Sequence, residues 1–258
     1  MTRILTCLAA ALFLIAAPAH AQQSSRLDDI MKRGTLRVGM TGDYLPFSYL
    51  DKATSKFRGF DVDMAEALAK ALGVKVEYVQ TAWPDLTKDF EADHFDIAMG
   101  GISITLERQK KGMFSTPIMR EGKTPIARCS DKAKFDTIAD IDKSGTRVIV
   151  NPGGTNERFA RANVKNAEIR VYNDNVTIFD EIAKGNADVM MTDASETRYQ
   201  QKLHAGVLCA VHPDRPFDFA EKAYWLQRDV ALKAFVDQWL HIAAEDGSFG
   251  KIYAAWFE

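Results

Sequence analysis

Apolar and polar positions follow two different periods along the chain. Short, mainly apolar runs at 35–41, 74–81 and 95–99 have the length and β-branched content of buried strands. Between the first two runs, residues 61–72 place apolar side chains on one face of a helix, which Gly73 terminates. Strands that alternate with helices in this way predict an α/β fold with parallel strand pairing.

The same order of elements recurs in the second half of the chain. Segments 86–99 (LTKDFEADHFDIAM) and 178–191 (IFDEIAKGNADVMM) both read as an amphipathic helix, a polar turn, an Asp and an apolar strand. We interpret the repeat as two lobes built on one plan. A single doubly wound sheet is the alternative, and the repeat disfavours it.

The expected lobe boundaries follow from two connecting segments. We place the first crossing near Lys123–Ala127 and the second in the proline-containing stretch His212–Phe219. Lobe 1 then comprises residues 22–125 and 220–258, and lobe 2 comprises residues 126–219. Because ligands of open α/β sheets lie beyond the carboxyl ends of the strands, the cleft between the lobes is the expected binding site.

Residues 1–21 have the layout of a secretory signal peptide, with Arg3, a short apolar run that contains Cys7, and a small-x-small cleavage pattern that ends at Ala21. This predicts an exported, periplasmic protein. No later stretch is long and apolar enough to span a membrane. The 33 Lys and Arg against 35 Asp and Glu, a formal net charge of −2, exclude the basic excess typical of nucleic-acid-binding proteins.

Two cysteines follow the signal segment, Cys129 and Cys209. An even pair in an oxidising compartment predicts a disulfide. Closing a loop of about 80 residues would contribute about 4 kcal/mol. Two free buried thiols are the alternative.

Several clusters follow the strands of the first lobe. Tyr44 and Trp83 could line the cleft, or could be ordinary packing residues. After the third strand come glycines 100 and 101, whose backbone N–H groups could approach a ligand closely. Ser103 and Arg108 follow them, and an Arg can hold a carboxylate through two parallel hydrogen bonds. A solvated Arg on a charged helix is the alternative.

The second lobe contributes two further clusters. The turn Asn151–Asn156, with Gly154 and Thr155, joins a strand to a helix and predicts an anion site at the helix N-terminus. Asp193 and Glu196 follow another strand. They could form a helix-capping box. They could also be two neighbouring acids with separated pKa values, one ionised and one protonated.

Other kinds of site find little support in the sequence. The histidines at 94, 204, 212 and 241 lack metal-ligand spacing, and no G-x-S-x-G nucleophile elbow is present. The turn at 151–156 is neither a phosphate loop nor a dinucleotide fingerprint. We therefore expect no metal site. Asn175 opens a glycosylation sequon, a pattern short enough to arise by chance.

Solute-binding proteins of amino-acid uptake systems carry segments that resemble TGDYLPFSY, GFDVDMAEALAKALG and GGISITLERQKKGMFSTP. The resemblance implies a two-lobed, periplasmic-binding-protein-like fold with two hinge crossings. It also implies that Ser103 and Arg108 hold a ligand's α-carboxylate, that Tyr44 and Trp83 form an aromatic wall, and that Asp193 pairs with an α-ammonium.

Periplasmic cyclohexadienyl dehydratases, which are enzymes on that scaffold, are similar over nearly all of the mature chain, in EGKTPI, IVNPGGTNERFARAN, DNVTIF, MMTDASETR, LCAVHP and PFDFAEKAYWLQRD. The resemblance implies conversion of prephenate to phenylpyruvate and of arogenate to phenylalanine, without a cofactor. Glu196 matches the family's general acid. Lys123, Asn151, Thr155 and Asn156 match its polar cleft residues. One departure is that Ile118 and Met119 follow Pro117, where relatives tend to carry an aromatic residue.

Three hypotheses follow: a dehydratase, an amino-acid-binding protein that delivers its ligand to a membrane permease, and the sensing module of a receptor. The third is disfavoured because no membrane segment follows the lobes. Under the first, the partner is a small molecule, prephenate or arogenate. Only arogenate carries an ammonium that could use Asp193, so the sequence leaves the preferred substrate open.

Overall fold

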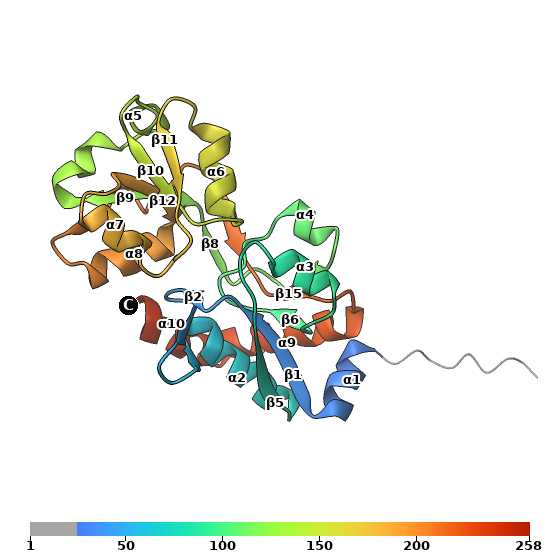
Figure 1. The fold of residues 1–258 in the computed structure, drawn as a ribbon. Coiled ribbons are helices and arrows are strands. Elements are labelled where there is room, and N and C mark those ends of the chain that lie inside the picture. Colours follow the sequence, from blue (N-terminus) through green and yellow to red (C-terminus); the bar gives the residue numbers. More distant parts are fainter. Residues whose placement is uncertain (1–24) are drawn as a thin grey trace, which may run out of the picture.

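The computed structural model describes residues 25–258, so the predicted signal peptide and Cys7 lie outside the described residues. The described chain forms two lobes that are joined side by side (Figure 1). Each lobe is built on its own five-stranded sheet. The expected two-lobed α/β architecture is confirmed.

Lobe 1 carries both ends of the described chain (Figure 1). Its sheet contains, in spatial order, β5 (Lys75–Gln80), β1 (Thr35–Met40), β6 (Ile97–Ala98), β15 (Trp225–Leu226) and β7 (Met113–Phe114). Its helices are α1 (Arg26–Arg33), α2 (Phe60–Leu72), α3 (Leu86–Glu91), α4 (Leu106–Gln109), α9 (Val230–Glu245) and α10 (Ser248–Phe257). A small antiparallel sheet adds β2 (Asp43–Tyr44), β3 (Ser48–Asp51) and β4 (Lys56–Arg58).

Lobe 2 repeats the plan. Its sheet contains, in spatial order, β11 (Glu168–Val171), β10 (Arg147–Val150), β12 (Val189–Asp193), β9 (Lys123–Arg128) and β13 (Leu208–Ala210). Its helices are η1 (Cys129–Lys134), α5 (Ile138–Ile141), α6 (Thr155–Asn163), α7 (Ile178–Ala183) and α8 (Ala194–Leu203). In both lobes the first three strands along the repeat pair in parallel, as expected, whereas β15 and β9 enter their sheets antiparallel. Both sheets are therefore mixed.

The lobes are connected by β8 (Met119–Glu121) and β14 (Ala220–Lys222), which pair antiparallel with each other. The prediction had put the first crossing near Lys123–Ala127 and had assigned residues up to 125 to lobe 1. The structure instead places Lys123 at the start of β9, where it pairs with Asp193 of β12. The apolar run that begins at Lys123 is thus a strand of the lobe 2 sheet, and the first connection between the lobes, β8, precedes it. The second connection likewise follows the predicted stretch at 212–219.

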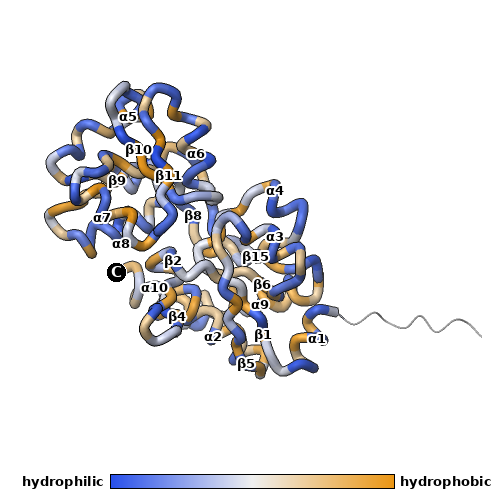
Figure 2. The backbone as a smooth tube through the Cα atoms, viewed as in Figure 1, coloured by the Kyte–Doolittle hydropathy of each residue, from blue (hydrophilic) through white to orange (hydrophobic). Residues whose placement is uncertain are grey.

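The buried apolar residues of each lobe form hydrophobic clusters, and Figure 2 colours the backbone of both lobes by residue hydropathy. In lobe 1 the C-terminal helix α10 closes the core, because the ring of Phe257 packs edge-on against Phe47 at 5.5 Å and Phe60 at 5.2 Å. Apolar burial of this kind is the main favourable contribution to folding. The aromatic contacts fix α10 on lobe 1, next to the connection.

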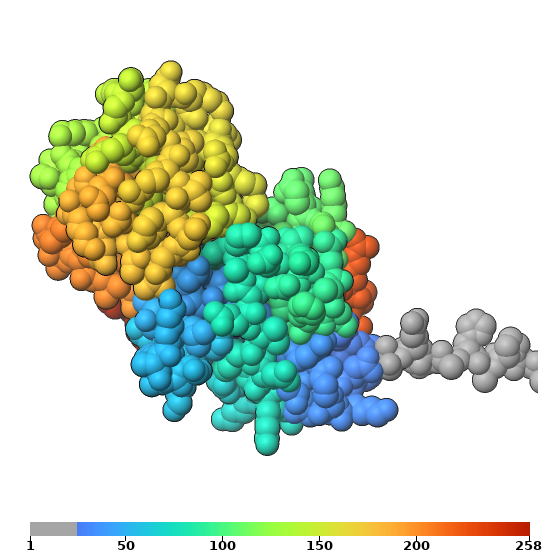
Figure 3. Space-filling view, viewed as in Figure 1, coloured from blue at the N-terminus to red at the C-terminus, as the bar shows by residue number. Residues whose placement is uncertain are grey.

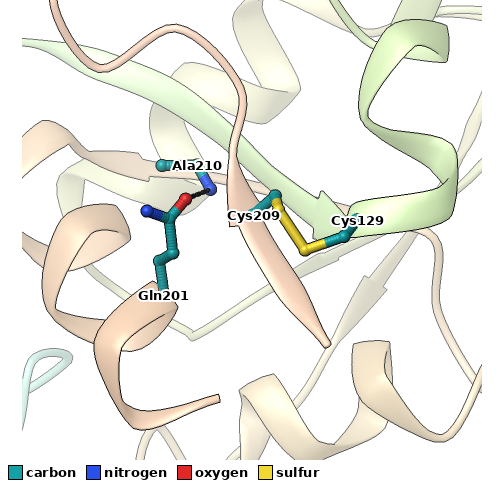
Figure 4. The surroundings of a disulfide bond; sticks show 4 residues. All are labelled: Cys129, Gln201, Cys209 and Ala210. Atoms are coloured by element: carbon teal, nitrogen blue, oxygen red, sulfur yellow. Dashed lines mark hydrogen bonds between the residues drawn. A yellow bond between two sulfur atoms is a disulfide. The ribbon is translucent and has the colours of Figure 1, made fainter. Parts of the chain in front are cut away.

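The disulfide is confirmed. Cys129, which begins η1 directly after β9, and Cys209 in β13 are bonded, with their Cα atoms 4.8 Å apart (Figure 4). Gln201 of α8 accepts a hydrogen bond from the backbone N–H of Ala210 at 2.9 Å, beside the bridge. The bond links an edge strand to its neighbour in the lobe 2 sheet.

Candidate functional site

The carboxyl ends of the strands of both lobes meet at a small cavity of about 10 Å³, which is room for about one water molecule. Lobe 2 is packed against lobe 1 in the space-filling view (Figure 3). Eight residues proposed from the sequence line the cavity: Tyr44, Trp83, Ser103, Asn151, Gly154, Thr155, Asn156 and Asp193. Gly101, Asn175 and Lys222 line it as well. The structure therefore shows the cleft in a closed form.

Three of the proposed site residues do not line the cavity. Arg108, Lys123 and Glu196 are 5%, 2% and 1% exposed and lie one layer deeper. Each is nevertheless connected to the lining by side-chain contacts or electrostatic interaction, described below. A ligand would reach these three groups only after the lobes separate and the lining residues move.

Asp193 is the centre of the polar network. Its Oδ1 accepts a hydrogen bond from the ammonium of Lys123 at 2.6 Å, and its Oδ2 accepts one from the ammonium of Lys222 at 2.5 Å. The hydroxyl of Tyr44, from lobe 1, also donates to Oδ2. Burial alone would raise the pKa of Asp193, but the two lysines outweigh it and hold the pKa well below its usual range. Asp193 is therefore ionised.

Lys123 joins this carboxylate to the turn at 151–156. Its ammonium donates to the hydroxyl of Thr155 at 2.9 Å and to Oδ1 of Asn156 at 2.5 Å. The amide of Asn156 donates in turn to Asn151 at 3.1 Å. Burial lowers the pKa of Lys123, and Asp193 offsets part of this effect. The polar residues proposed from the sequence thus form one connected network.

Lys222 is the charged lining residue that the sequence reasoning missed. It ends the connecting strand β14 and is 1% exposed. Burial alone would lower its pKa, but the nearby carboxylates of Asp193 and Glu121 outweigh burial and raise it. A lysine inside the apolar stretch KAYWL was the available signal, because a lysine among buried residues requires a charged partner.

Glu196 lies in the first turn of α8, and the hydroxyl of Thr192 links it to the network around Asp193. Thr192 donates to its Oε2 at 2.5 Å and accepts a hydrogen bond from the amide of Asn156 at 2.9 Å. Its Oε1 has no hydrogen-bond partner among residues 25–258. Burial, aided by the negative charge of Asp193, raises the pKa of Glu196 to about 8. At neutral pH Glu196 therefore carries a proton.

The capping-box alternative for Asp193 and Glu196 does not describe this structure. Asp193 stands at the N-cap of α8, yet its side chain makes no capping hydrogen bond and points to the lysines. The two neighbouring carboxyl groups thus have different environments. Asp193 is held ionised by cations, and Glu196 is held neutral by burial.

Arg108 is buried, unlike the solvated arginine of the alternative interpretation. Thr105 caps helix α4 by accepting from the backbone N–H of Arg108 at 3.2 Å. The guanidinium donates to the backbone carbonyl of Ser103 at 2.8 Å. Burial and the nearby Arg158 lower the pKa of Arg108 to about 10, so it remains a cation at neutral pH. A buried cation bonded to the backbone of Ser103 suits a carboxylate ligand.

The glycines after β6 have a different role from the one expected. We expected the backbone N–H groups of Gly100 and Gly101 to approach a ligand. In the structure they donate to Oδ2 of Asp61 on α2 at 2.8 and 2.6 Å. Gly101 also leaves no space for a Cβ atom, which would lie 2.4 Å from the ring of Tyr44. These glycines position the loop and the aromatic wall.

Contacts across the cleft hold the lobes together. Asn175 of lobe 2 donates to the backbone carbonyl of Asp43 of lobe 1 at 3.0 Å. Within lobe 1, the indole N–H of Trp83 donates to the carboxylate of the same Asp43 at 3.0 Å. Gly153, with φ of 77°, approaches Pro84 of lobe 1 so closely that a Cβ atom would lie 2.6 Å from its Cα. One glycine of the turn therefore permits closure, a function that the anion-site interpretation did not include.

Residues 25–258 contain no group of three or more His, Cys, Asp or Glu arranged to hold a metal ion. None of the helices described here is long and apolar enough to cross a membrane.

The chain matches the model of the bacterial extracellular solute-binding proteins, family 3, over residues 36–258. It belongs to this family. A curated relative, the cyclohexadienyl dehydratase of Pseudomonas aeruginosa, is 55% identical over 258 residues, which cover all of this chain and 94% of the relative. The family assignment agrees with the lobes, the crossings and the interlobe cleft.

Two solved structures of ancestral proteins are similar to this chain. One is an amino acid-binding protein described as a precursor of cyclohexadienyl dehydratase. It is 39% identical, has a TM-score of 0.83, and the match covers 91% of this chain and 100% of that chain. The other is an ancestral cyclohexadienyl dehydratase. It is 52% identical, has a TM-score of 0.58, and the match covers 92% of this chain and 98% of that chain. The higher identity accompanies the lower TM-score.

Proposed function

We propose that this chain is a cyclohexadienyl dehydratase, a carbon–oxygen lyase of the periplasm, with Glu196 as its general acid. The full-length 55% identity to the Pseudomonas aeruginosa dehydratase carries the proposal. A buried, protonated Glu196 beside an ionised Asp193 supports the assignment of the acid, because an acid must hold its proton at working pH. Its substrates are prephenate and arogenate.

The reaction needs one proton and no oxidant or reductant. Glu196 protonates the ring hydroxyl, and the C–O bond breaks to release water. The C–C bond to the ring carboxylate breaks as well, CO₂ leaves, and its electron pair completes the aromatic ring. Prephenate thus becomes phenylpyruvate, and arogenate becomes phenylalanine. Glu196, left as a carboxylate, regains its proton from solvent.

The remaining cleft residues bind and orient the substrate. Arg108 and Ser103 hold the side-chain carboxylate through charge-assisted hydrogen bonds. Lys123 and the turn residues Asn151, Gly154, Thr155 and Asn156 hold the ring carboxylate. Tyr44 and Trp83 face the ring. Because that carboxylate must leave, these contacts raise the rate only if they stabilise the transition state more than the bound substrate.

Closure of the lobes completes the site. The cavity of about 10 Å³ is far smaller than any C₁₀ substrate, so the lobes open for entry and close over the bound molecule. Closure removes water from Glu196 and so maintains its raised pKa. It also places Tyr44 of lobe 1 against Asp193 of lobe 2.

The test is turnover by the purified chain and by Glu196→Gln. Phenylpyruvate is measured by its ultraviolet absorbance in alkali, and phenylalanine by chromatography. We expect kcat to fall about 10²–10⁴-fold in the variant, because the glutamine cannot supply the proton, while the substrate still binds. Glu245→Gln removes an exposed carboxyl group of α9 and should leave kcat unchanged.

No turnover of either substrate by the unmodified chain would exclude the enzyme. Calorimetry with the standard amino acids would then test the alternative, an amino-acid-binding protein of a membrane permease. Turnover that survives in Glu196→Gln would instead exclude Glu196 as the acid and leave the dehydratase assignment in place.

A further inference from the structure

Lys222 is a buried cation that the chemistry above does not use. Its ammonium lies 2.5 Å from Oδ2 of Asp193, 3.0 Å from the hydroxyl of Ser103 and 3.6 Å from Oε1 of Glu121. It also lies 5.1 Å from the centre of the Tyr44 ring, within the range of a cation–π contact. The ammonium thus lies between the acidic and hydroxyl groups of the cleft and lines the cavity.

The backbone of Lys222 is fixed by both neighbouring segments. Its carbonyl accepts a hydrogen bond from Ile118 at 2.8 Å, Met119 is its partner in the β14–β8 pair, and Ser103 forms a β-bridge with it. A lysine held in this way returns to the same place whenever the cleft closes. Its ammonium is therefore a constant part of the closed site.

The two candidate substrates differ only at the group that would meet this ammonium. Beside its side-chain carboxylate, arogenate carries an ammonium, whereas prephenate carries a keto oxygen. An ammonium in the cleft needs an anionic acceptor, and Asp193 is the ionised carboxylate that lines the cavity. Both oxygens of Asp193 already accept from lysines, so a substrate ammonium would compete with Lys222 and be repelled by it.

The charges of the site also favour prephenate over arogenate. Arg108, Lys123 and Lys222 are buried cations, and the carboxylates of Asp193 and Glu121 can neutralise no more than two of them. Prephenate brings two negative charges and arogenate brings one net negative charge. A cleft with excess positive charge therefore binds the dianion better, since buried charges must be paired.

We propose that Lys222 is a specificity-determining residue: its ammonium occupies the place on Asp193 that a substrate ammonium would need, so that the cleft selects the keto acid prephenate over the amino acid arogenate. The proposal rests on the proposed function, because it concerns the two substrates of that reaction. A keto oxygen can accept a hydrogen bond from Lys222, and an ammonium cannot.

The first test compares kcat/KM for prephenate and arogenate in the unmodified chain, Lys222→Met and Lys123→Met. We expect the unmodified chain to prefer prephenate. Lys222→Met should shift the ratio of the two kcat/KM values toward arogenate by about ten- to hundredfold, the value of one hydrogen bond to a charged group. Lys123→Met removes an equally buried partner of Asp193, but one that contacts Thr155 and Asn156 and is assigned to the ring carboxylate that both substrates share. Because only Lys222 also contacts Ser103, next to which the keto or ammonium group would bind, Lys123→Met should lower both values and shift their ratio clearly less than Lys222→Met does.

A second measurement does not depend on turnover. Phenylpyruvate and L-phenylalanine differ by the same keto and ammonium groups, and calorimetry gives their affinities for the unmodified chain, Lys222→Met and Lys222→Gln. Thermal unfolding followed by circular dichroism identifies variants that remain folded. The unmodified chain should bind phenylpyruvate more tightly, and both substitutions should reverse or reduce this preference.

The outcomes separate the two proposals. A preference for arogenate and L-phenylalanine in the unmodified chain, an unchanged ratio in the folded Lys222 variants, or an equal shift in Lys123→Met would each overturn the role of Lys222. Absence of turnover together with a shifted binding ratio would overturn the dehydratase and keep Lys222 as the residue that discriminates keto acids from amino acids.

Discussion

At the amino end of β6 in lobe 1, Asp96 accepts a hydrogen bond from the backbone N–H of Arg37 at 2.9 Å. At the amino end of β12 in lobe 2, Asp188 accepts the same bond from Arg147, also at 2.9 Å. In both lobes the arginine side chain returns to the same carboxylate, at 2.9 and 2.6 Å. The repeated Asp before the apolar strand thus fastens a central strand to its neighbour in each lobe.

The carboxyl ends of the same strands differ. After β6, Gly100 and Gly101 donate to Asp61, and no acid follows them until Glu107. At the end of β12, Asp193 binds two lysines, and Glu196 follows in the next turn. The polar contacts that occur in both lobes support the fold, and the unrepeated polar contacts at the end of β12 form the site. The predictions below test this division.

Removal of the disulfide, which only lobe 2 contains, should have the largest effect on stability. We expect Cys129→Ser with Cys209→Ser to lower the free energy of unfolding by up to about 4 kcal/mol, because the unfolded chain regains the freedom of a loop of 80 residues. Urea unfolding followed by circular dichroism measures the change. The unmodified chain under a thiol reductant is the matched control. An unchanged midpoint in both would refute the prediction.

Loss of either repeated carboxylate should reduce stability and spare catalysis. Asp96→Asn and Asp188→Asn each weaken several charge-assisted hydrogen bonds, so we expect each to lower the free energy of unfolding by about 2 kcal/mol. Below the unfolding temperature, kcat for prephenate should remain within about twofold of the unmodified chain. A large loss of kcat in a folded Asp188→Asn variant would show that the repeated contacts also support the site.

Glu196, which has no counterpart in lobe 1, should set the alkaline limit of activity. Burial raises the pKa of Glu196 from 4.5 to about 8, so the protonated form that the reaction requires is lost as pH rises through that value. We expect kcat to be level near neutrality and to fall by about tenfold per pH unit above the pKa. The residual activity of Glu196→Gln should lack this limb. A kcat that rises through pH 8 would contradict a protonated catalyst.

The same pKa shift has a consequence for stability. The folded chain holds the proton of Glu196 more tightly than the unfolded chain does, so its contribution to stability is complete below about pH 4.5 and is lost as pH rises toward 8. Glu196→Gln, which is neutral at every pH, should remove this dependence. Urea unfolding at neutral and alkaline pH measures the difference.

Much of the fold and site could be read from the chain. Local periodicity located α2 nearly to the residue, and the two cysteines predicted their own bond. The position of the crossings could not be found in this way. The run that begins at Lys123 is equally consistent with a connection and a strand, and only its pairing with β12 distinguishes them.

The site shows the same limit. Ten of the eleven residues proposed for binding or catalysis follow the ends of strands or lie at helix starts, and sequence patterns mark such places. Lys222 lies in the short connecting strand β14, where no hydrophobic periodicity marks it as a residue of the site. Its role depends on Asp193, 29 residues away along the chain. Neither residue shows in its local pattern that the other is its partner.

The sequence by itself determined the two repeated lobes, the disulfide and the identities of the polar groups, because each of these depends on local pattern or composition; the export segment at its start stays a prediction. Only the tertiary structure decided which acid is ionised and which keeps its proton. That choice depends on burial and on the distance to cations: two ammonium groups lie within 2.6 Å of Asp193, whereas Glu196 has a threonine hydroxyl. Such distances arise only when strands from both lobes and the connection between them come together.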